Sequence, residues 1–450
     1  MYENPVITVL GAGYVGLTTA ALLAHSGYTV YAVEPNASRL NAIKRGKSFF
    51  YEKGLDPIIE SALDSGTLIP TDSYEMGIPK SDVIFSCVGT PDNPDGSSNL
   101  TYVFNAAKEA ARYLKPGSIY IQKSTVPVGT GADIEKLFTK LNKQIDYVSN
   151  PEFLREGTAL QDTLFFDRIV VGGNNKQATD TVLSIYRNLE ACRETIATKA
   201  DVTSGSRKGE YITTSLNSAE LIKVTANAFL ALKISFANSI AKLADTVGAD
   251  VVDVMNAVGA DERIGSSFLH AGRGYGGGCF PKDVSGLIAS GHQHGVELEI
   301  MTAARAVNDS MPGYIIKKLQ NKLGDSLKNK QITVLGLAFK AGTSDVRRSP
   351  GVAIANALQR TGAIVRTYDP QVQDEAADDY VDGIMQQTSL EAAIKGADIV
   401  VITTEWLEFT TYHAANYAKL MKGSLLFDAV NCLDIPSVQA AGLTYVGVGR

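Results

Sequence analysis

The chain of 450 residues is long enough for two to four domains, because one domain commonly holds about 100 to 200 residues. It contains 42 Lys and Arg against 48 Asp and Glu, and the formal net charge of −6 disfavours nucleic acid or an anionic membrane surface as a partner. Hydrophobic residues make up 45% and charged residues 20%, which is typical of a globular protein and excludes a disordered chain.

The four cysteines lie far apart and form no CxxC pair, which argues against a disulfide framework or a zinc ribbon and favours a reducing compartment. The first residues lack the basic start, apolar stretch and cleavage site of a signal peptide. No apolar run approaches the roughly 20 residues that cross a bilayer. We therefore expect a cytoplasmic protein without a membrane partner.

The first 200 residues alternate between strand and helix patterns. An apolar run at 6–10 meets the glycine turn GAGYVG, then the helical LTTAALLAHSG and a second strand that ends at Glu34. Further strands are expected in DVIFSCVG, SIYIQKS, DYVSN and DRIVVGG, and a helix in YVFNAAKEAARYLK. This order predicts an α/β fold with a doubly wound parallel sheet.

Two further segments follow. Residues 198–213 combine Gly, Ser and mixed charge, and we expect an exposed connector there. From Ser215 to Gly248 the apolar positions keep a helical period without Pro or internal Gly, which predicts one long helix. Such a helix cannot bury its whole apolar surface on one small domain, so we expect it to link two domains and to form the interface of a homodimer or higher homo-oligomer.

A second βαβ pattern begins at Gln331, after the loop GRGYGGGCFPKD and a helical stretch near 300–323. Its turn, GLAFKAGTSD, lacks the GxGxxG spacing, so we expect it to bind a different ligand. The sequence thus predicts two Rossmann-like doubly wound parallel-sheet domains joined by a long central helix. The expected domains are 1–210, 211–325 and 326–450.

A dinucleotide site is predicted in the first βαβ unit. Gly11, Gly13 and Gly16 fit GxGxxG between a strand and a helix, whose N-terminus attracts a pyrophosphate. Glu34 ends the next strand, where a carboxylate accepts ribose hydroxyls and repels a 2′-phosphate. NAD is therefore favoured over NADP, although Arg39 favours NADP. The alternative is a glycine turn without a ligand.

Cys279 lies in GYGGGCFPKD, where three glycines, an aromatic residue and Pro shape a loop that other groups can approach closely. Lys282 and Asp283 follow within four residues and can tune a thiolate or hold water. A nucleophile is favoured over a structural thiol. The other cysteines are interpreted as structural, Cys87 inside an apolar strand, Cys192 at a helix end and Cys432 after a buried strand.

Lys223 and Asn227 lie four residues apart on the long helix and share one face, where both can donate hydrogen bonds to an oxyanion. The alternative is a solvated ion pair between Lys223 and Glu220, one turn before it. His292 and His294 form HQH without further ligands at metal spacing, so they are expected at the surface and no metal site is predicted.

The carboxyl edge of the first sheet carries further polar residues. Glu152 and Glu156 follow a strand and a Pro at the edge where doubly wound folds bind ligands, so one of them is a candidate general base. The alternative for Glu156 is a cap at a helix start. Thr90 and Thr125 end strands at the same edge, where a hydroxyl can hold a cofactor phosphate, an amide or water.

The motifs GAGYVG, VGTPD, STVPV, NPEFLREGTA, AELIKVTANAFLALKISFANS, DERIGSSFL, GYGGGCFPKD and GLAFKAGTSDVR together resemble the UDP-glucose/GDP-mannose dehydrogenase family, and within it the UDP-glucose 6-dehydrogenases, over nearly the whole chain. The resemblance implies an NAD-dependent four-electron oxidation of UDP-glucose at C6 to UDP-glucuronate. It also implies an N-terminal Rossmann domain, a central helical dimerisation domain and a C-terminal UDP-binding domain. A GDP-mannose 6-dehydrogenase is the alternative, and a UDP-N-acetylmannosamine dehydrogenase or an inactive nucleotide-sugar binder ranks lower.

The resemblance also implies roles for individual residues. Cys279 would be the nucleophile, Glu152 the acid/base of thioester hydrolysis, Lys223 and Asn227 the oxyanion donors, and Thr125 and Asp283 the water holders. The cofactor contacts implied are Gly11, Gly13, Tyr14, Val15, Gly16, Glu34, Arg39, Thr90, Thr125, Glu156, Lys282 and Arg347. The substrate contacts implied are Glu152, Phe153, Leu154, Arg155, Glu156, Lys223, Asn227, His270, Arg273, Gly274, Tyr275, Gly276, Phe339 and Lys340, together with Arg263 from a neighbouring subunit.

The chain departs from the family pattern at three positions. Gly278 replaces a common Ser, Arg348 a common Glu, and Val430 an Arg that family members use as a substrate contact. Asn431 and Arg273 are the two candidates to replace that contact, and Arg273 would offer charge to the diphosphate.

Overall fold

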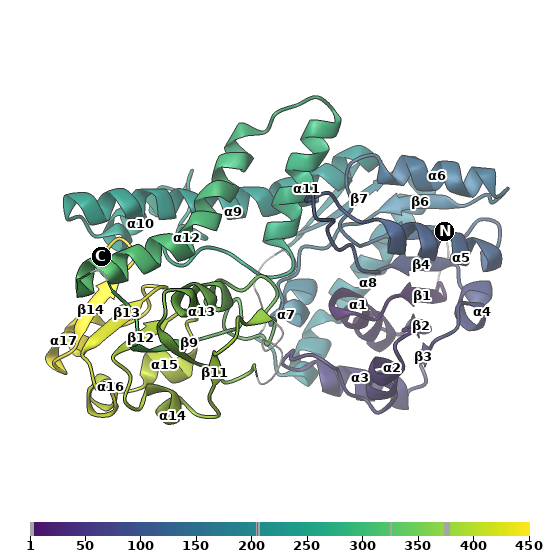
Figure 1. The fold of residues 1–450 in the computed structure, drawn as a ribbon. Coiled ribbons are helices and arrows are strands. Elements are labelled where there is room, and N and C mark those ends of the chain that lie inside the picture. The colour runs from purple at the N-terminus through teal and green to yellow at the C-terminus, as the bar shows by residue number, and fades with distance from the viewer. Residues whose placement is uncertain (1–3, 204, 206–207, 325, 373–378) are drawn as a thin grey trace. The chain divides into compact units, whose positions relative to one another are not determined.

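The computed structural model describes residues 4–203, 205, 208–324, 326–372 and 379–450. The chain divides into two compact units, residues 1–226 and 227–450, and each unit contains one sheet covered by helices (Figure 1). The division into three domains stays a prediction.

The first unit contains an eight-stranded sheet in the order β3-β2-β1-β4-β5-β6-β7-β8. The reversal of strand order between β1 and β4 makes the carboxyl ends of these two strands the expected ligand crevice of a doubly wound sheet. The strands are β1 (Ile7–Leu10), β2 (Val30–Val33), β3 (Leu68–Thr71), β4 (Val83–Ser86), β5 (Ile119–Gln122), β6 (Asp146–Ser149), β7 (Arg168–Gly173) and β8 (Glu210–Thr214).

Helices cover both faces of this sheet because successive strand residues point to opposite sides. Ile119 and Ile121 pack into the core under α1, α3 and α8, whereas Tyr120 packs under α5 and α6. The helices are α1 (Tyr14–His25), α2 (Ala37–Lys44), α3 (Leu55–Asp64), α4 (Tyr74–Gly77), η1 (Ile78–Lys80), α5 (Thr101–Tyr113), α6 (Thr130–Lys140), α7 (Ala159–Leu164) and α8 (Lys176–Ala200). The predicted fold class is confirmed.

Two details of the first unit differ from expectation. Strand β7 pairs antiparallel with β6, and the chain between them holds the short helix α7. The predicted connector at 198–213 was wrong in part, since α8 continues to Ala200 and Glu210–Thr214 forms β8 beside β7. Residues 204, 206 and 207 of that segment lie outside the described residues.

The long helix is confirmed as α9 (Leu216–Val247), and the boundary between the two units falls within it, as expected of a linking helix. Contrary to the expectation from sequence, α9 is long and apolar enough to cross a membrane by length and composition. No other helix among the described residues meets both criteria. Its most apolar 18-residue window has a mean hydropathy of 1.2, and 44% of that window is buried inside the protein.

The second unit contains a six-stranded sheet in the order β11-β10-β9-β12-β13-β14, and all its neighbouring strands are parallel. The order reverses between β9 and β12, as it does between β1 and β4. Its strands are β9 (Gln331–Leu335), β10 (Ile364–Tyr368), β11 (Met385–Gln386), β12 (Ile399–Ile402), β13 (Leu425–Asp428) and β14 (Thr444–Gly447). Its helices, beside the end of α9, are α10 (Val251–Gly259), α11 (Phe280–Gln293), α12 (Glu299–Leu323), α13 (Pro350–Arg360), α14 (Leu390–Ile394), α15 (Leu407–Thr411), α16 (Ala414–Leu420) and α17 (Ile435–Ala440).

Candidate active site

The three glycines of the turn after β1 differ in what their lack of a side chain allows. Gly11 has φ +81°, a left-handed conformation that side chains rarely adopt. A Cβ on Gly16 would stand 1.9 Å from the Gly11 carbonyl oxygen, so its absence lets α1 pack closely on the turn. A Cβ on Gly13 would meet nothing within 4 Å, which leaves its backbone open to a ligand at the start of α1. These are the requirements of a pyrophosphate turn.

Glu34 follows β2 directly and is 4% exposed. Its Oε1 accepts the Asn36 N–H at 3.0 Å, which fixes the carboxylate beside the end of the strand. Arg39 is exposed on α2, with its guanidinium 4.8 Å from the centre of the Phe49 ring. The buried carboxylate fits ribose hydroxyls and disfavours a second negative group, so these residues fit NAD.

Tyr14 opens α1 and connects the glycine turn to the loop after β6. Its hydroxyl donates to the Glu52 carboxylate and accepts the Gly157 N–H, and its ring stacks on Phe50 with centroids 4.2 Å apart. Burial and the hydrogen bond to Glu52 raise the pKa of Tyr14 far above its ordinary value. Tyr14 therefore stays protonated and acts as a structural link at the cofactor turn.

The ends of β4, β5 and β6 gather most of the predicted polar residues of the first unit. Thr90 and Thr125 are half-buried in the loops after β4 and β5. Arg155 is exposed and binds Asp162 with two parallel hydrogen bonds of 2.9 and 2.6 Å. Glu156 is half-buried, and Thr158 holds the N-cap position of α7, so Glu156 is not the cap of that helix.

Glu152 forms an ion pair with a buried lysine that the sequence did not reveal. Its Oε2 lies 2.6 Å from the Nζ of Lys123, whose side chain is 2% exposed. Its Oε1 accepts the N–H groups of Phe153 at 2.8 Å and Leu154 at 3.1 Å. Burial would raise the pKa of Glu152, but the Lys123 ammonium and the N–H groups outweigh it and lower this pKa.

Helix α9 brings Lys223 to the same part of the first unit. Lys223 is 7% exposed and its Nζ lies 5.2 Å from the centre of the Phe153 ring. Glu220 is 2% exposed and accepts the N–H groups of Gly129 and Gly131, each at 2.7 Å, at the start of α6. The alternative of a solvated Lys223–Glu220 pair is therefore wrong, because both side chains are buried.

In the second unit, Cys279 is the N-cap residue of α11 and its side chain is exposed. Three of its neighbours form one buried network. The Asp283 carboxylate accepts from Asn227 Nδ2 at 2.5 Å and from Lys282 Nζ at 2.6 Å, and the Asp283 N–H donates to the Cys279 carbonyl. A helix N-terminus stabilises negative charge, so this position suits a thiolate nucleophile.

The other cysteines are consistent with structural roles. Burial raises the pKa of Cys87, which follows β4, to about 12, and burial with the nearby Asp428 raises that of Cys432 further. The expectation for Cys192 was wrong in position, because it lies in the middle of α8 and not at its end. Neither raised pKa favours a thiolate.

The glycines before Cys279 allow its loop to pack against backbone. A Cβ on Gly276 would stand 2.4 Å from the Arg348 carbonyl oxygen, and one on Gly272 would stand 2.6 Å from that of Ala429. The Tyr275 N–H donates to Asn308 Oδ1 at 2.7 Å. The loop that holds the thiol is thus fixed to the loops at the carboxyl edge of the second sheet.

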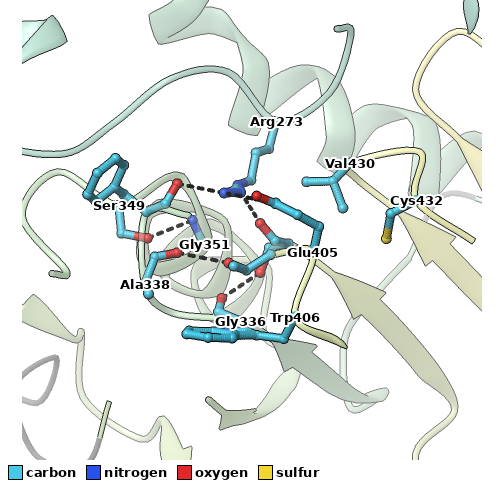
Figure 2. Close-up of polar contacts among 12 residues, drawn as sticks. Arg273, Gly336, Ala338, Ser349, Gly351, Glu405, Trp406, Val430 and Cys432 are labelled. Atoms are coloured by element: carbon cyan, nitrogen blue, oxygen red, sulfur yellow. Dashed lines mark hydrogen bonds and ion pairs between the residues drawn. The ribbon is translucent and has the colours of Figure 1, made fainter. Parts of the chain in front are cut away.

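Arg273 lies at the reversal point of the second sheet and is 6% exposed (Figure 2). Its guanidinium donates to the carbonyl of Thr403 after β12 and to that of Phe339 after β9, the second at 2.7 Å. Glu405 lies 3.9 Å away and is half exposed. The Nε of Arg273 has no hydrogen-bond partner among the described residues. Arg273 therefore joins the two loops between which a ligand is expected.

The remaining predicted contacts are mostly exposed. Arg263 pairs with Asp261, and Arg347 pairs with Asp345. Phe339 and Lys340 are half-buried after β9, whereas His270, His292 and His294 are exposed. Among the described residues no group of three or more His, Cys, Asp or Glu side chains is arranged to hold a metal ion.

Two departures from the family pattern have a local explanation. A Cβ on Gly278 would stand 2.5 Å from the Arg347 guanidinium carbon, so the missing side chain makes room for Arg347. Asn431 is held by backbone, since its Nδ2 donates to Ala271 and Val448 at 3.2 and 2.9 Å. It therefore does not replace the charge absent at Val430, whereas Arg273, shown beside Val430 in Figure 2, carries one.

The fold and these residues define a dinucleotide-dependent oxidoreductase with a second nucleotide-binding sheet. Three segments match domains of the UDP-glucose/GDP-mannose dehydrogenase family: residues 6–190 its NAD binding domain, 217–310 its central domain and 333–435 its UDP binding domain. The chain belongs to this family, and it is an NAD-dependent oxidoreductase.

Known proteins resemble the chain over its full length. The UDP-glucose 6-dehydrogenase of Rhizobium meliloti (strain 1021) is 39% identical over 449 residues, which are 99% of each chain. The structure of a UDP-glucose dehydrogenase from Pyrobaculum islandicum has a TM-score of 0.89 at 34% identity, with 99% of this chain and 98% of that chain covered. The structure of a UDP-D-ManNAc dehydrogenase from Pyrococcus horikoshii has a TM-score of 0.86 at 28% identity, with 99% of both chains covered.

Proposed function

We propose that the protein oxidises UDP-glucose at C6 to UDP-glucuronate with two molecules of NAD. The observation that carries the proposal is the exposed Cys279 at the start of α11, beside the network in which Asp283 binds Asn227 and Lys282. A dehydrogenase that stops at the aldehyde needs no nucleophile, whereas the second oxidation needs a covalent hydrate-like adduct. The family membership and the relatives named above support the same substrate class.

The thiol allows the two oxidations to proceed on one enzyme. The C6 alcohol loses a hydride and a proton and becomes an aldehyde. The Cys279 sulfur adds to the aldehyde carbon and forms a thiohemiacetal, which loses a second hydride from carbon and the proton of its hydroxyl group and becomes a thioester. Water then cleaves the C–S bond, so the acid leaves and the thiol returns. NAD, when bound at the turn after β1, supplies the hydride acceptor.

We assign the other roles by chemistry. Lys223 and Asn227 donate hydrogen bonds to the oxygen on C6 as it gains charge. Glu152 takes the proton of the hydrolytic water, and Thr125 and Asp283 hold that water.

We also propose that the protein forms a homodimer or a higher homo-oligomer through α9. Phe229, Phe236 and Leu243 are 58%, 49% and 57% exposed, and they repeat every seven residues along one face of the helix. A monomer rarely leaves such a row of large apolar side chains in water. In the proposed oligomer, α9 of a second copy covers this row. This contact accounts for an apolar helix of which only part is buried within a single chain.

The function is tested by measuring NADH from purified protein with UDP-glucose, UDP-N-acetylmannosamine and GDP-mannose in parallel. We expect UDP-glucose to have the highest kcat/KM and to yield two NADH per uronic acid. A higher kcat/KM with either other sugar nucleotide assigns that substrate instead. One NADH per sugar, with free aldehyde as product, would contradict the role of Cys279.

A further inference from the structure

The carboxyl ends of β5 and β6 hold a network of buried polar groups that the proposed chemistry does not yet use. In the register of these strands Gln122 lies beside Ser149, so Lys123 and Asn150 are the next residues beyond the paired strands. Glu152 follows two residues later. Neighbouring parallel strands therefore deliver a lysine and a carboxylate to the same buried place.

Lys123 is held from two sides. Its Nζ contacts Glu152 Oε2 at 2.6 Å and donates to the Tyr186 hydroxyl at 2.8 Å. Tyr186, on α8, donates in turn to Asn150 Oδ1 at 2.5 Å, and Asn150 Nδ2 donates to the Val170 carbonyl at 2.9 Å. The ammonium cannot turn away from Glu152 without breaking this chain of hydrogen bonds.

The contacts of Glu152 leave it one acceptor position. A carboxylate has about four acceptor positions, and three are filled by Lys123 and by the N–H groups of Phe153 and Leu154. One water molecule can occupy the fourth. These contacts therefore hold the Glu152 carboxylate in one orientation and favour its ionised form.

We propose that Lys123 is a positioning residue that keeps Glu152 ionised and aimed, so that Glu152 accepts a proton from the hydrolytic water. The inference rests on the proposed role of Glu152 in thioester hydrolysis.

Glu152 needs a cation beside it in order to stay ionised. A buried carboxylate without a partner retains its proton to higher pH, because burial disfavours the charged form. Three further groups face Glu152 or its partner: Lys223 from α9, Tyr186 from α8 and Cys87 after β4. Burial raises the pKa of Tyr186 and of Cys87, so both stay neutral. Of the two cations, Lys223 is assigned to the substrate oxygen, which leaves Lys123 as the permanent partner.

The test removes the charge while the protein stays folded. Lys123→Met and Lys123→Gln are neutral, Lys123→Arg retains the charge, and Lys115→Met is the matched control. Lys115 pairs with Asp82 at 2.7 Å at the opposite, amino edge of the same sheet. Lys123→Gln keeps a hydrogen-bond donor, and so remains informative if Lys123→Met does not fold.

The first readout needs no substrate. Infrared difference spectra of the ligand-free proteins near neutral pH, taken against wild type, should show an additional protonated carboxyl band in both neutral variants and not in Lys123→Arg or Lys115→Met. The band should vanish when Glu152→Gln is added. If neither neutral variant shows this band, the inference is wrong, whatever the substrate proves to be.

The second readout is the pH profile of uronic acid formation. The acid limb should move up by about 1 to 3 pH units in the neutral variants, the usual effect of removing an opposite charge beside a carboxylate. Lys123→Arg should restore the limb toward its original position, and KM should change less than kcat. An unmoved limb would overturn the inference, whereas wild-type protein inactive on all three sugar nucleotides would overturn the proposed function and leave the infrared result standing.

Discussion

Cys279 differs from the other cysteines in both position and surroundings. Cys279 is exposed at a helix N-terminus. Cys87 and Cys432, in contrast, have a raised pKa. Cys192 lies on α8 and packs against the hydrophobic core. Cys279 is therefore the cysteine that best fits the proposed thioester chemistry.

Replacing Cys279 with Ser should stop acid formation, because a serine hydroxyl is a weaker nucleophile and its ester a poorer intermediate. We expect turnover to fall by roughly 1,000-fold or more, as loss of a covalent nucleophile commonly causes. The measurement is uronic acid formed from UDP-glucose, with Cys192→Ser as the control of unchanged rate. Near wild-type acid production by Cys279→Ser would exclude a covalent role.

Glu34 should determine the choice of cofactor, because its buried carboxylate repels a 2′-phosphate. Wild-type protein should have a much higher kcat/KM for NAD than for NADP. Glu34→Gln should reduce that preference by roughly 10- to 100-fold, the value of a hydrogen bond to a charged group. Arg39→Ala is the control that should not increase the use of NADP. Equal use of both cofactors by wild type would mean that Arg39 dominates.

Several candidate site residues were predicted from residue type and spacing alone. The glycine turn, Glu34, Cys279 and Asp283 were predicted in this way, and the structure joins Asp283 to Asn227 by a hydrogen bond. Their roles stay predictions. Lys123 was missed, because its burial depends on which strand lies beside β5. A lysine directly after an apolar strand, at the same edge as Glu152, was the available signal.

At the scale of elements, the long helix was predictable to within one residue at each end, because no Pro or Gly interrupts its period. The direction of β7 was not predictable, since alternation of side chains is the same in parallel and antiparallel strands. Strand β8 was missed because its burial is incomplete and its residues EYITT are half polar. The direction of β7 and the formation of β8 are both determined by which strand lies beside them in the sheet, and not by the local sequence pattern.

The contact between α9 and α6 should make stability depend on pH. Burial raises the pKa of Glu220 to about 7, although the N–H groups of Gly129 and Gly131 oppose it. In the unfolded chain this carboxyl titrates near its ordinary value, so above that value the unfolded state loses a proton that the native state retains. The free energy of unfolding should therefore fall as pH rises from about 4.5 to 7, by up to about 3 kcal/mol from this residue.

Urea unfolding at several pH values in this window tests the expectation. Glu220→Gln should flatten the slope, whereas Glu109→Gln, at a half-buried residue paired with Arg112 on α5, should not change it. A slope that Glu220→Gln leaves unchanged would mean that the two glycine N–H groups prevail over burial.

At the scale of the whole molecule, the exposed row on α9 predicts the oligomeric state. Phe236→Asp places a charge in the middle of this row and should shift the protein toward a monomer in light scattering or analytical ultracentrifugation. Leu407→Asp, at a residue 73% exposed on α15, is the control that should keep the wild-type mass. A wild-type monomer, or an unchanged mass for Phe236→Asp, would contradict the proposed interface.

The continuity of α9 fixes the spacing of two candidate site residues along the helix. Lys223 and Asn227 stand four residues apart in one uninterrupted helix, so about 6 Å of helical rise separates their backbones. This interval is a property of the helix and does not depend on the orientation of the domains. The backbone spacing of the two proposed donors is therefore set by α9 alone. A single helix thus fixes the distance along its axis between the two residues that we propose to contact the C6 oxygen.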